Sequence, residues 1–231
     1  MLVKELYLET KEKSNVMLLT SYNQGSGKLF LTMNIALSLA IKAKKVLVID
    51  GDMRYAASST YVGSPKVGLS SYLNGLVDKW QGIIVPDEKY PNMEVLPVGI
   101  LPPNPTELIY GNRLADLISE ARSAYDYVLI DCPPIEVVAD VQLIGKYVDR
   151  TIFIIRAGLL KRTVLPELQR LYDENKYKNI VLAFNGTESP SSAYDYRYSY
   201  RYGYYYGHYV HYMHDMAKGN RYRGKHKWII K

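Results

Sequence analysis

A glycine-rich turn followed by a lysine stands near the start of the chain, between an apolar run and a segment of helical character. Residues 16–19 predict a short buried strand, the turn ends in Gly25-Ser26-Gly27-Lys28, and residues 29–42 predict a helix. In such an arrangement, glycines let backbone N–H groups approach phosphate oxygens, and the helix N-terminus and the lysine add positive charge. The stretch therefore predicts a loop that holds a phosphate chain.

Two positions depart from the usual phosphate-loop pattern. Tyr22 occupies the place of the first glycine, and Leu29 replaces the Ser or Thr whose hydroxyl normally binds Mg²⁺. A strand–helix turn with packing glycines and one exposed lysine is the alternative interpretation of this stretch.

Acidic residues follow two further apolar runs. Residues 46–49 end in Asp50 and Asp52, and residues 127–130 end in Asp131. An aspartate at a strand end can simply cap the next turn. However, the carboxyl ends of strands in an open α/β sheet face the ligand crevice, and Mg²⁺ accepts carboxylates together with phosphate oxygens. Together with Lys28, these carboxylates predict a nucleotide site.

The alternation of apolar runs and helical segments predicts the fold class. Strands are expected at 16–19, 46–49, 93–98, 127–130, 150–156 and 179–184, and helices at 29–42, 68–74, 112–123 and about 163–175, with another starting at Pro105. Continuous apolar strands alternating with helices are typical of an α/β protein with a doubly wound, mostly parallel sheet.

Composition indicates one globular domain and a distinct tail. The chain has 231 residues, a single cysteine, Cys132, and no apolar run as long as a membrane span. From Tyr194 onward it carries eight Lys or Arg against two Asp, whereas the preceding residues carry equal numbers of both signs. We expect a lead-in at 1–15, a phosphate-loop domain at 16–190 and a flexible, basic, Tyr-rich tail at 191–231, with no nucleic-acid surface on the globular part.

The motifs together resemble the bacterial tyrosine kinases, a P-loop family that regulates capsule and exopolysaccharide assembly. The phosphate loop is similar to that family's Pro-Gly-x-Gly-Lys form, with Gln24 in place of the proline. Residues 46–54 resemble its second Walker motif, 129–134 its Walker B motif with two following prolines, and 102–105 its Pro-Pro-Asn-Pro connector. Septum-site and partition ATPases share part of this pattern but carry a lysine where this chain has Asn23.

A cluster of tyrosines near the C-terminus extends the resemblance, and the family uses such a cluster as its phosphorylation substrate. Its members are Tyr194, Tyr196, Tyr198, Tyr200, Tyr202, Tyr204, Tyr205, Tyr206, Tyr209 and Tyr212. A sticky or base-stacking low-complexity segment is the alternative. His208, His211 and His214 could bind a metal on a helix, although no Cys or acidic residue completes the set.

The resemblance implies roles for the site residues in an ATP- and Mg²⁺-dependent protein-tyrosine kinase. Lys28, Asp50 and Asp52 would be catalytic, with Asp50 orienting the incoming phenol and accepting its proton, and Asp52 and Asp131 would hold Mg²⁺. The nucleotide-binding set would be Gln24, Gly25, Ser26, Gly27, Lys28, Leu29, Phe30 and Asn185, the last contacting adenine.

The resemblance also implies partners and a location. The activator would be the cytoplasmic segment of a membrane polysaccharide co-polymerase, the chain would form a homo-oligomer, and a tyrosine phosphatase would reverse the modification. The protein would be cytoplasmic, at the inner face of the cell membrane. Because Leu29 lacks the metal-binding hydroxyl, a nucleotide-binding regulatory subunit with little or no kinase activity is the rival expectation.

Overall fold

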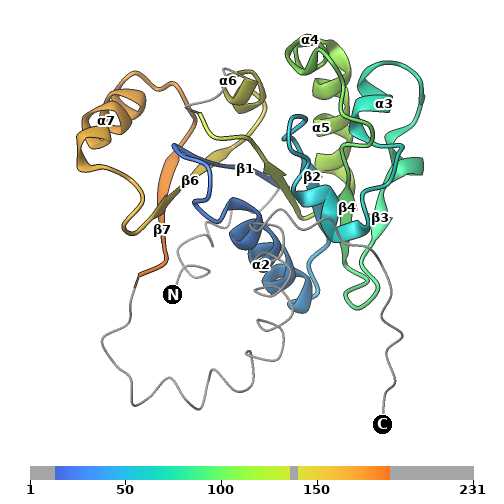
Figure 1. Ribbon diagram of the computed structural model, residues 1–231. Helices are drawn as coiled ribbons and strands as arrows, with labels where there is room; N and C mark the ends of the chain where they lie inside the picture. The colour runs from blue at the N-terminus through green and yellow to red at the C-terminus, as the bar shows by residue number, and fades with distance from the viewer. Residues whose placement is uncertain (1–13, 136–139, 188–231) are drawn as a thin grey trace, which may run out of the picture. The chain divides into compact units, whose positions relative to one another are not determined.

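A seven-stranded sheet forms the centre of the computed structural model, which describes residues 14–135 and 140–187 (Figure 1). The strands are β1 (Asn15–Ser21), β2 (Val46–Asp50), β3 (Val85–Pro86), β4 (Met93–Leu96), β5 (Tyr127–Asp131), β6 (Arg150–Arg156) and β7 (Ile180–Asn185). Their order is β3-β4-β2-β5-β1-β6-β7, and only the β3–β4 pair is antiparallel. The predicted mostly parallel sheet is confirmed.

Helices cover both faces of this sheet, as Figure 1 shows. They are α2 (Lys28–Ile41), α3 (Leu69–Leu73), α4 (Pro105–Tyr110), α5 (Asn112–Ala124), α6 (Asp140–Gly145) and α7 (Leu165–Asp173). Helix α2 packs on one face over Met17 and Val48, while α3 to α7 pack on the other over Leu18 and Ile49. Alternate residues of each strand thus enter opposite cores, and for this reason the central strands are apolar throughout.

The strand order brings the predicted chemistry to one edge. Strand β1 lies between β5 and β6, and β5 lies between β1 and β2. In the register, Asp131 is the neighbour of Leu19 on one side and of Asp50 on the other. Since these strands are parallel, the phosphate loop after β1 and the aspartates ending β2 and β5 emerge at the same end.

One strand and one α-helix escaped the sequence analysis, besides short 3₁₀ turns. Strand β3 has only two residues and pairs antiparallel with β4, and α6 is a single short helix after the Pro133-Pro134 turn. Neither is long enough to show a hydrophobic period. The helix expected at 163–175 is shorter and begins at Leu165, after a 3₁₀ turn over Arg162–Val164.

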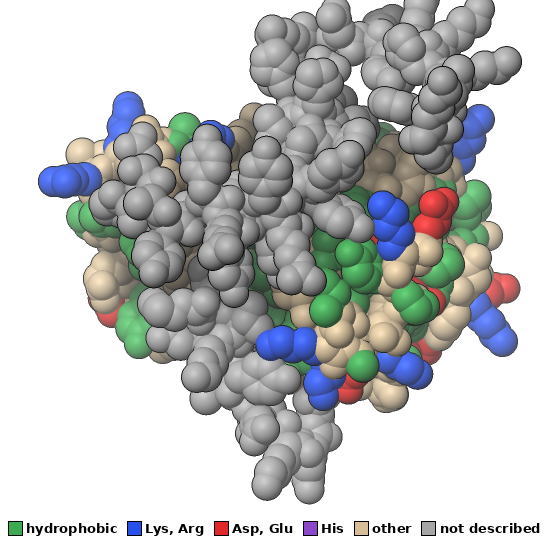
Figure 2. Space-filling view, turned by 90° about the horizontal axis from the view of Figure 1, so that it is seen from below, with side chains coloured by type: hydrophobic (Ala, Val, Ile, Leu, Met, Phe, Trp, Pro, Cys, Tyr) green, Lys and Arg blue, Asp and Glu red, His purple; other side chains and the backbone are tan. Residues whose placement is uncertain are grey.

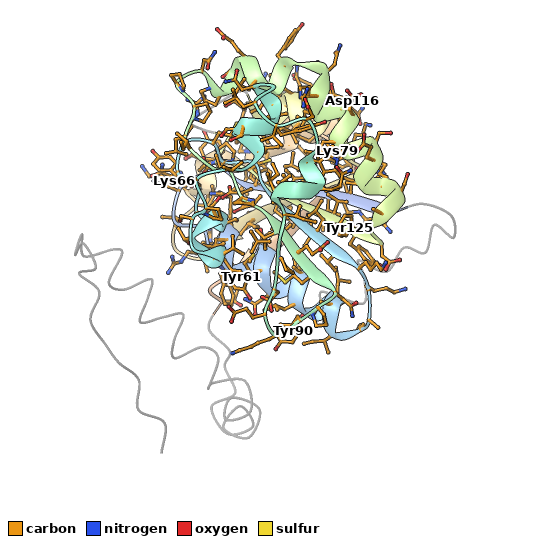
Figure 3. The ribbon with its side chains drawn as sticks, turned by 90° about the vertical axis from the view of Figure 1, so that its right-hand side faces the viewer. Tyr61, Lys66, Lys79, Tyr90, Asp116 and Tyr125 are labelled. Carbon is orange, nitrogen blue, oxygen red and sulfur yellow. The ribbon has the colours of Figure 1, made fainter. Side chains whose placement is uncertain are left out.

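The β3–β4 edge carries tyrosines that serve the fold, seen in Figure 3 as Tyr61, Tyr90 and Tyr125. The Tyr61 hydroxyl donates to Asp87 Oδ2 at 2.7 Å, and the Tyr125 hydroxyl donates to Glu94. Burial, followed by the adjacent carboxylate, raises the pKa of Tyr125. The phenols of Tyr61 and Tyr125 are committed to internal hydrogen bonds.

Where grey atoms do not cover the view in Figure 2, basic, acidic and apolar side chains are interspersed. Among the described helices, none is long and apolar enough to cross a bilayer. Cys132 is buried, as expected of a small apolar core residue. The tyrosine cluster, the three histidines and the predicted boundary at 190 lie outside the described residues.

Candidate nucleotide-binding site

The phosphate loop adopts a conformation that requires glycine at two places. Gly25 and Gly27 have φ values of 73° and 87°, in the left-handed region that other residues rarely enter. Between them, Ser26 is 3% exposed, and its hydroxyl donates to the carbonyl of Asn23 at 2.9 Å. The Ser21 hydroxyl donates to the same carbonyl at 2.7 Å, so the loop is held from both sides.

Helix α2 begins at Lys28, directly after the loop. In the described part of the chain, no side chain caps this helix N-terminus, which leaves its backbone dipole available to an anion. The Lys28 Nζ lies 3.5 Å from Ser21 Oγ. Burial lowers the pKa of Lys28, and the charges of Asp131 and Asp52 oppose that shift. The lysine and two of the predicted carboxylates therefore share one electrostatic environment.

Leu29 and Phe30 occupy the first turn of α2. Both are partly buried, and Leu29 packs against the core on the α2 face of the sheet. Further along the same helix, the fully buried Thr32 donates its hydroxyl to the Lys28 carbonyl at 3.0 Å. Leu29 thus contributes apolar contact at the position where related loops place a hydroxyl.

Asp50 is fully buried at the end of β2 and accepts three hydrogen bonds. The backbone N–H and the hydroxyl of Ser59 donate to Oδ2 at 2.6 and 2.7 Å, and the Asp52 N–H donates to Oδ1 at 3.2 Å. The Ser59 hydroxyl also accepts from the Val98 N–H, which ties this carboxylate to the connector after β4. Burial and the neighbouring Asp131 raise the pKa of Asp50 to about 7.

Asp131, at the end of β5, is 2% exposed and has one oxygen without a partner. Ser58 Oγ donates to Oδ2 at 2.5 Å, whereas Oδ1 has no hydrogen-bond partner among the described residues. Burial raises the pKa of Asp131 to about 6, against the Ser58 hydrogen bond and the charge of Lys28. A buried, unpartnered carboxylate oxygen is costly and fits a ligand position.

Asp52 lies in the turn after β2 and is anchored by its own loop. Its Oδ1 accepts the N–H groups of Arg54 and Tyr55, both at 3.2 Å. The Arg54 guanidinium in turn binds Asp140 Oδ2 at 2.9 Å, and Thr106 donates to Asp140 Oδ1 at 2.7 Å. This network joins the Asp52 loop to α4 and α6.

Sequence reasoning missed the residues that hold these carboxylates. Ser58 and Ser59 lie in a short 3₁₀ turn, far along the chain from Asp131, and carry no recognisable motif. For Asn185, which the resemblance assigns to adenine, the structure shows that its Nδ2 donates to the Ser26 carbonyl at 2.9 Å. Gln24 and Gly25 are exposed at the tip of the loop.

The residues present fit Mg²⁺ and a nucleotide. The charges of Asp52 and Asp131 act on one lysine, Lys28, and a third buried carboxylate, Asp50, lies beside Asp131, so carboxylates outnumber the lysine and a hard divalent cation can balance them. The uncapped helix N-terminus and the preformed glycine loop suit a phosphate group. Asp52, and Asp131 through its unpartnered Oδ1, would hold the metal.

The raised carboxylate pKa values predict how stability depends on pH. The folded pKa values of Asp50 and Asp131, about 7 and about 6, lie above those of the unfolded chain. The folded state therefore binds more protons, and its extra stability is lost as pH rises through these values. We expect the free energy of unfolding without Mg²⁺ or nucleotide to fall between about pH 5 and pH 8. Urea unfolding across this range measures it; a flat or rising profile would contradict the assignment.

The chain is similar to known proteins in sequence. Residues 14–145 match the family described as AAA domain. Tyrosine-protein kinase CpsD of Streptococcus agalactiae serotype III (strain NEM316) is 31% identical over 185 residues, which cover 79% of each chain. Tyrosine-protein kinase YwqD of Bacillus subtilis (strain 168) is 34% identical over 181 residues, covering 78% of this chain and 76% of YwqD.

Solved structures show the same fold. The kinase domain of Escherichia coli tyrosine kinase ETK superposes with a TM-score of 0.72 at 30% identity, covering 83% of this chain and 74% of that domain. The septum site-determining protein MinD of Pyrococcus horikoshii, complexed with Mg-ADP, has a TM-score of 0.60 at 22% identity over 74% of this chain and 69% of MinD, a likeness of fold alone. The architecture is P-loop NTPase-like, and the chain belongs to the bacterial tyrosine-protein kinase family.

Proposed function

We propose that this chain is an ATP-dependent protein-tyrosine kinase that phosphorylates the tyrosine cluster at 194–212 of a neighbouring copy. In this role it regulates capsular or exopolysaccharide synthesis and export. The observation that carries the proposal is the convergence of Lys28, Asp52 and Asp131, whose charges interact, at the mouth of a preformed phosphate loop. Membership of the tyrosine-kinase family supports the choice of acceptor.

Binding of the triphosphate is assigned to the loop and the start of α2. Backbone N–H groups from Gly25 to Leu29 would surround the β- and γ-phosphates, and Lys28 would add its charge. Asp52 and Asp131 would hold Mg²⁺, which neutralises charge on the phosphates when bound. Most of the rate gain would come from positioning and charge neutralisation, as in other phosphoryl transfers.

Asp50 is the proposed proton acceptor for the tyrosine hydroxyl. A pKa of about 7 suits a base that works near neutral pH. In this structure, its carboxylate is fully buried behind Ser59. A phenol can therefore reach Asp50 only after groups around it move, and Ser59 holds the carboxylate in the arrangement without substrate.

The tail supplies an electrostatic reason for regulation. It accounts for the formal net charge of +6, and each phosphotyrosine adds about −1.5 to −2 charges at neutral pH. Three or four modified tyrosines would therefore cancel the tail's charge and weaken its docking on the acidic site of another copy. A homo-oligomer, a phosphatase and a membrane co-polymerase segment as activator complete the proposal. It places the protein in the cytoplasm, at the inner face of the membrane.

Phosphotyrosine formation tests the proposed activity directly. The purified full chain is incubated with Mg-ATP, with and without an activator peptide, and the tail is analysed by mass spectrometry. We expect phosphate on the 194–212 tyrosines and none when Mg²⁺ is chelated. Nucleotide binding without phosphotyrosine under both conditions would favour the regulatory subunit that Leu29 suggests.

Leu29→Thr tests how far the missing hydroxyl limits this site. Restoring a hydroxyl ligand for Mg²⁺ at the first turn of α2 should tighten Mg-ADP binding and raise phosphorylation by about tenfold, which corresponds to about 1.4 kcal/mol. The lost apolar contact should lower the free energy of unfolding by about 1 kcal/mol. Leu29→Ala loses the same contact without gaining a hydroxyl and is the matched control, and equal affinities for both variants would refute the prediction.

A further inference from the structure

Two side chains from neighbouring strand ends contact successive carbonyls of the phosphate loop. Arg156, the last residue of β6, donates from Nη1 to the Gly25 carbonyl at 2.8 Å. Asn185, the last residue of β7, donates from Nδ2 to the Ser26 carbonyl at 2.9 Å. The two residues are register partners in the sheet, so one rigid platform holds both carbonyls.

The loop sequence is adapted to this contact. Glycine is favoured at position 27 by its φ of 87°, and a Cβ there would collide with the Asn185 amide and displace it from the loop. By contrast, a Cβ on Gly25 would meet no described atom within 4 Å. Of these two glycines, only Gly27 is approached closely, and the approaching group is the Asn185 amide.

Holding a carbonyl also orients the N–H of the next residue, since both belong to one planar peptide unit. The Gly25 and Ser26 carbonyls share their peptide planes with the N–H groups of Ser26 and Gly27. Fastening these carbonyls to the sheet keeps those N–H groups from rotating, and such donors bind an anion best when they are already aligned.

We propose that Arg156 and Asn185 form a clamp that positions the phosphate loop, and that Asn185 acts through this loop rather than by reading the base. Both are positioning residues. The consequence for affinity rests on the proposed function, because it concerns how the nucleotide is bound. The clamp itself consists of hydrogen bonds within this chain and does not depend on a nucleotide.

The test compares ligands that share phosphates but differ in the base. For the full-length variants Asn185→Ala and Arg156→Ala, binding of ADP, GDP and inorganic pyrophosphate with Mg²⁺ is measured by calorimetry. We expect each variant to lose about threefold to tenfold in affinity, by the same factor for all three ligands, as befits one lost hydrogen bond to the loop. A loss for ADP with unchanged pyrophosphate binding would overturn the proposal in favour of base contact.

Matched controls lie at the opposite ends of the same strands. Asn179 donates its Nδ2 to the Asp149 carbonyl at 2.8 Å, and its φ is 44°, so Asn179→Ala should lose at least as much stability as Asn185→Ala. Arg150→Gln changes an arginine at the start of β6. Both controls should keep wild-type affinity for every ligand, and a loss as large as in the clamp variants would overturn the proposal.

Amide hydrogen exchange separates the clamp from nucleotide binding. Without any ligand, the N–H groups of residues 25–29 should exchange faster in Asn185→Ala and Arg156→Ala than in the wild type or the controls. Unchanged exchange would overturn the clamp. If the wild type bound none of the three ligands, the proposed function would fail, and the exchange measurement would still decide the clamp.

Discussion

Asp131→Asn is expected to stabilise the protein while removing its response to Mg-nucleotide. At pH 8 the Asp131 carboxylate of the wild type is ionised, although it is 2% exposed and lies next to Asp50. Because its pKa is raised to about 6, keeping it ionised lowers the free energy of unfolding by about 3 kcal/mol. Asparagine carries no charge and keeps an oxygen for Ser58, so we expect a gain of about 1–2 kcal/mol after the cost of an unpaired amide.

The opposite effect is expected when ligand is present. Mg-ADP should raise the melting temperature of the wild type, because it binds the folded state, and should leave that of Asp131→Asn almost unchanged. With EDTA, Asp131→Asn would then have the higher melting temperature, and with saturating Mg-ADP the wild type would have the higher one. Asp116→Asn, which changes an exposed aspartate on α5 (Figure 3), should change neither value. An Asp131→Asn protein that is less stable without ligand would contradict the assigned burial cost.

Lys28→Met should remove phosphorylation with little change in the fold. The charge of Lys28 acts on both Asp52 and Asp131, whereas that of Arg54 acts on Asp52. Without Lys28, the negative carboxylates repel the γ-phosphate, and a donor to the transition-state charge is lost. We expect phosphotyrosine formation to fall by about 10²- to 10³-fold, the usual effect of losing one such donor.

Lys79→Met provides the matched control for this variant. Lys79 is exposed and lies at the turn before β3 (Figure 3), so the same change in charge and size occurs away from the loop. Initial rates of phosphotyrosine formation and circular dichroism spectra are compared for both variants. Phosphorylation by Lys28→Met at the wild-type rate would mean that the loop after β1 is not the ATP site.

The local sequence pattern predicted most of the strands and helices. Residues 150–156 form β6 with the expected bounds, and Pro105 begins α4 as its ring favours. By contrast, β3 was invisible because two residues carry no period, and α6 because it is too short to show one. These misses lie at elements whose existence depends on a neighbour rather than on their own sequence.

The candidate site divides in a similar way. Asp50, Asp52 and Asp131 could be selected from the sequence because each lies at or just after the end of an apolar strand, and Lys28 because it ends the glycine loop that follows another; parallel strands end at a common edge. The hydrogen-bond partners of these carboxylates could not be selected in this way. Ser58 and Ser59 contact Asp131 and Asp50 because the 3₁₀ turn that contains both serines folds back toward the strand ends, and no local sequence pattern predicts that contact.

The amino-acid sequence by itself determined the phosphate loop, the acidic strand ends and the fold class, because backbone conformation and apolar periodicity are set by residues close together in the chain. Only the tertiary structure decided which side chains hold that loop and those carboxylates. Arg156 and Asn185 meet the loop because β6 and β7 follow β1 in the sheet, and Asp140 meets Arg54 because α6 packs against β1 and α4. Such contacts join residues far apart in the chain, so strand order and packing alone create them.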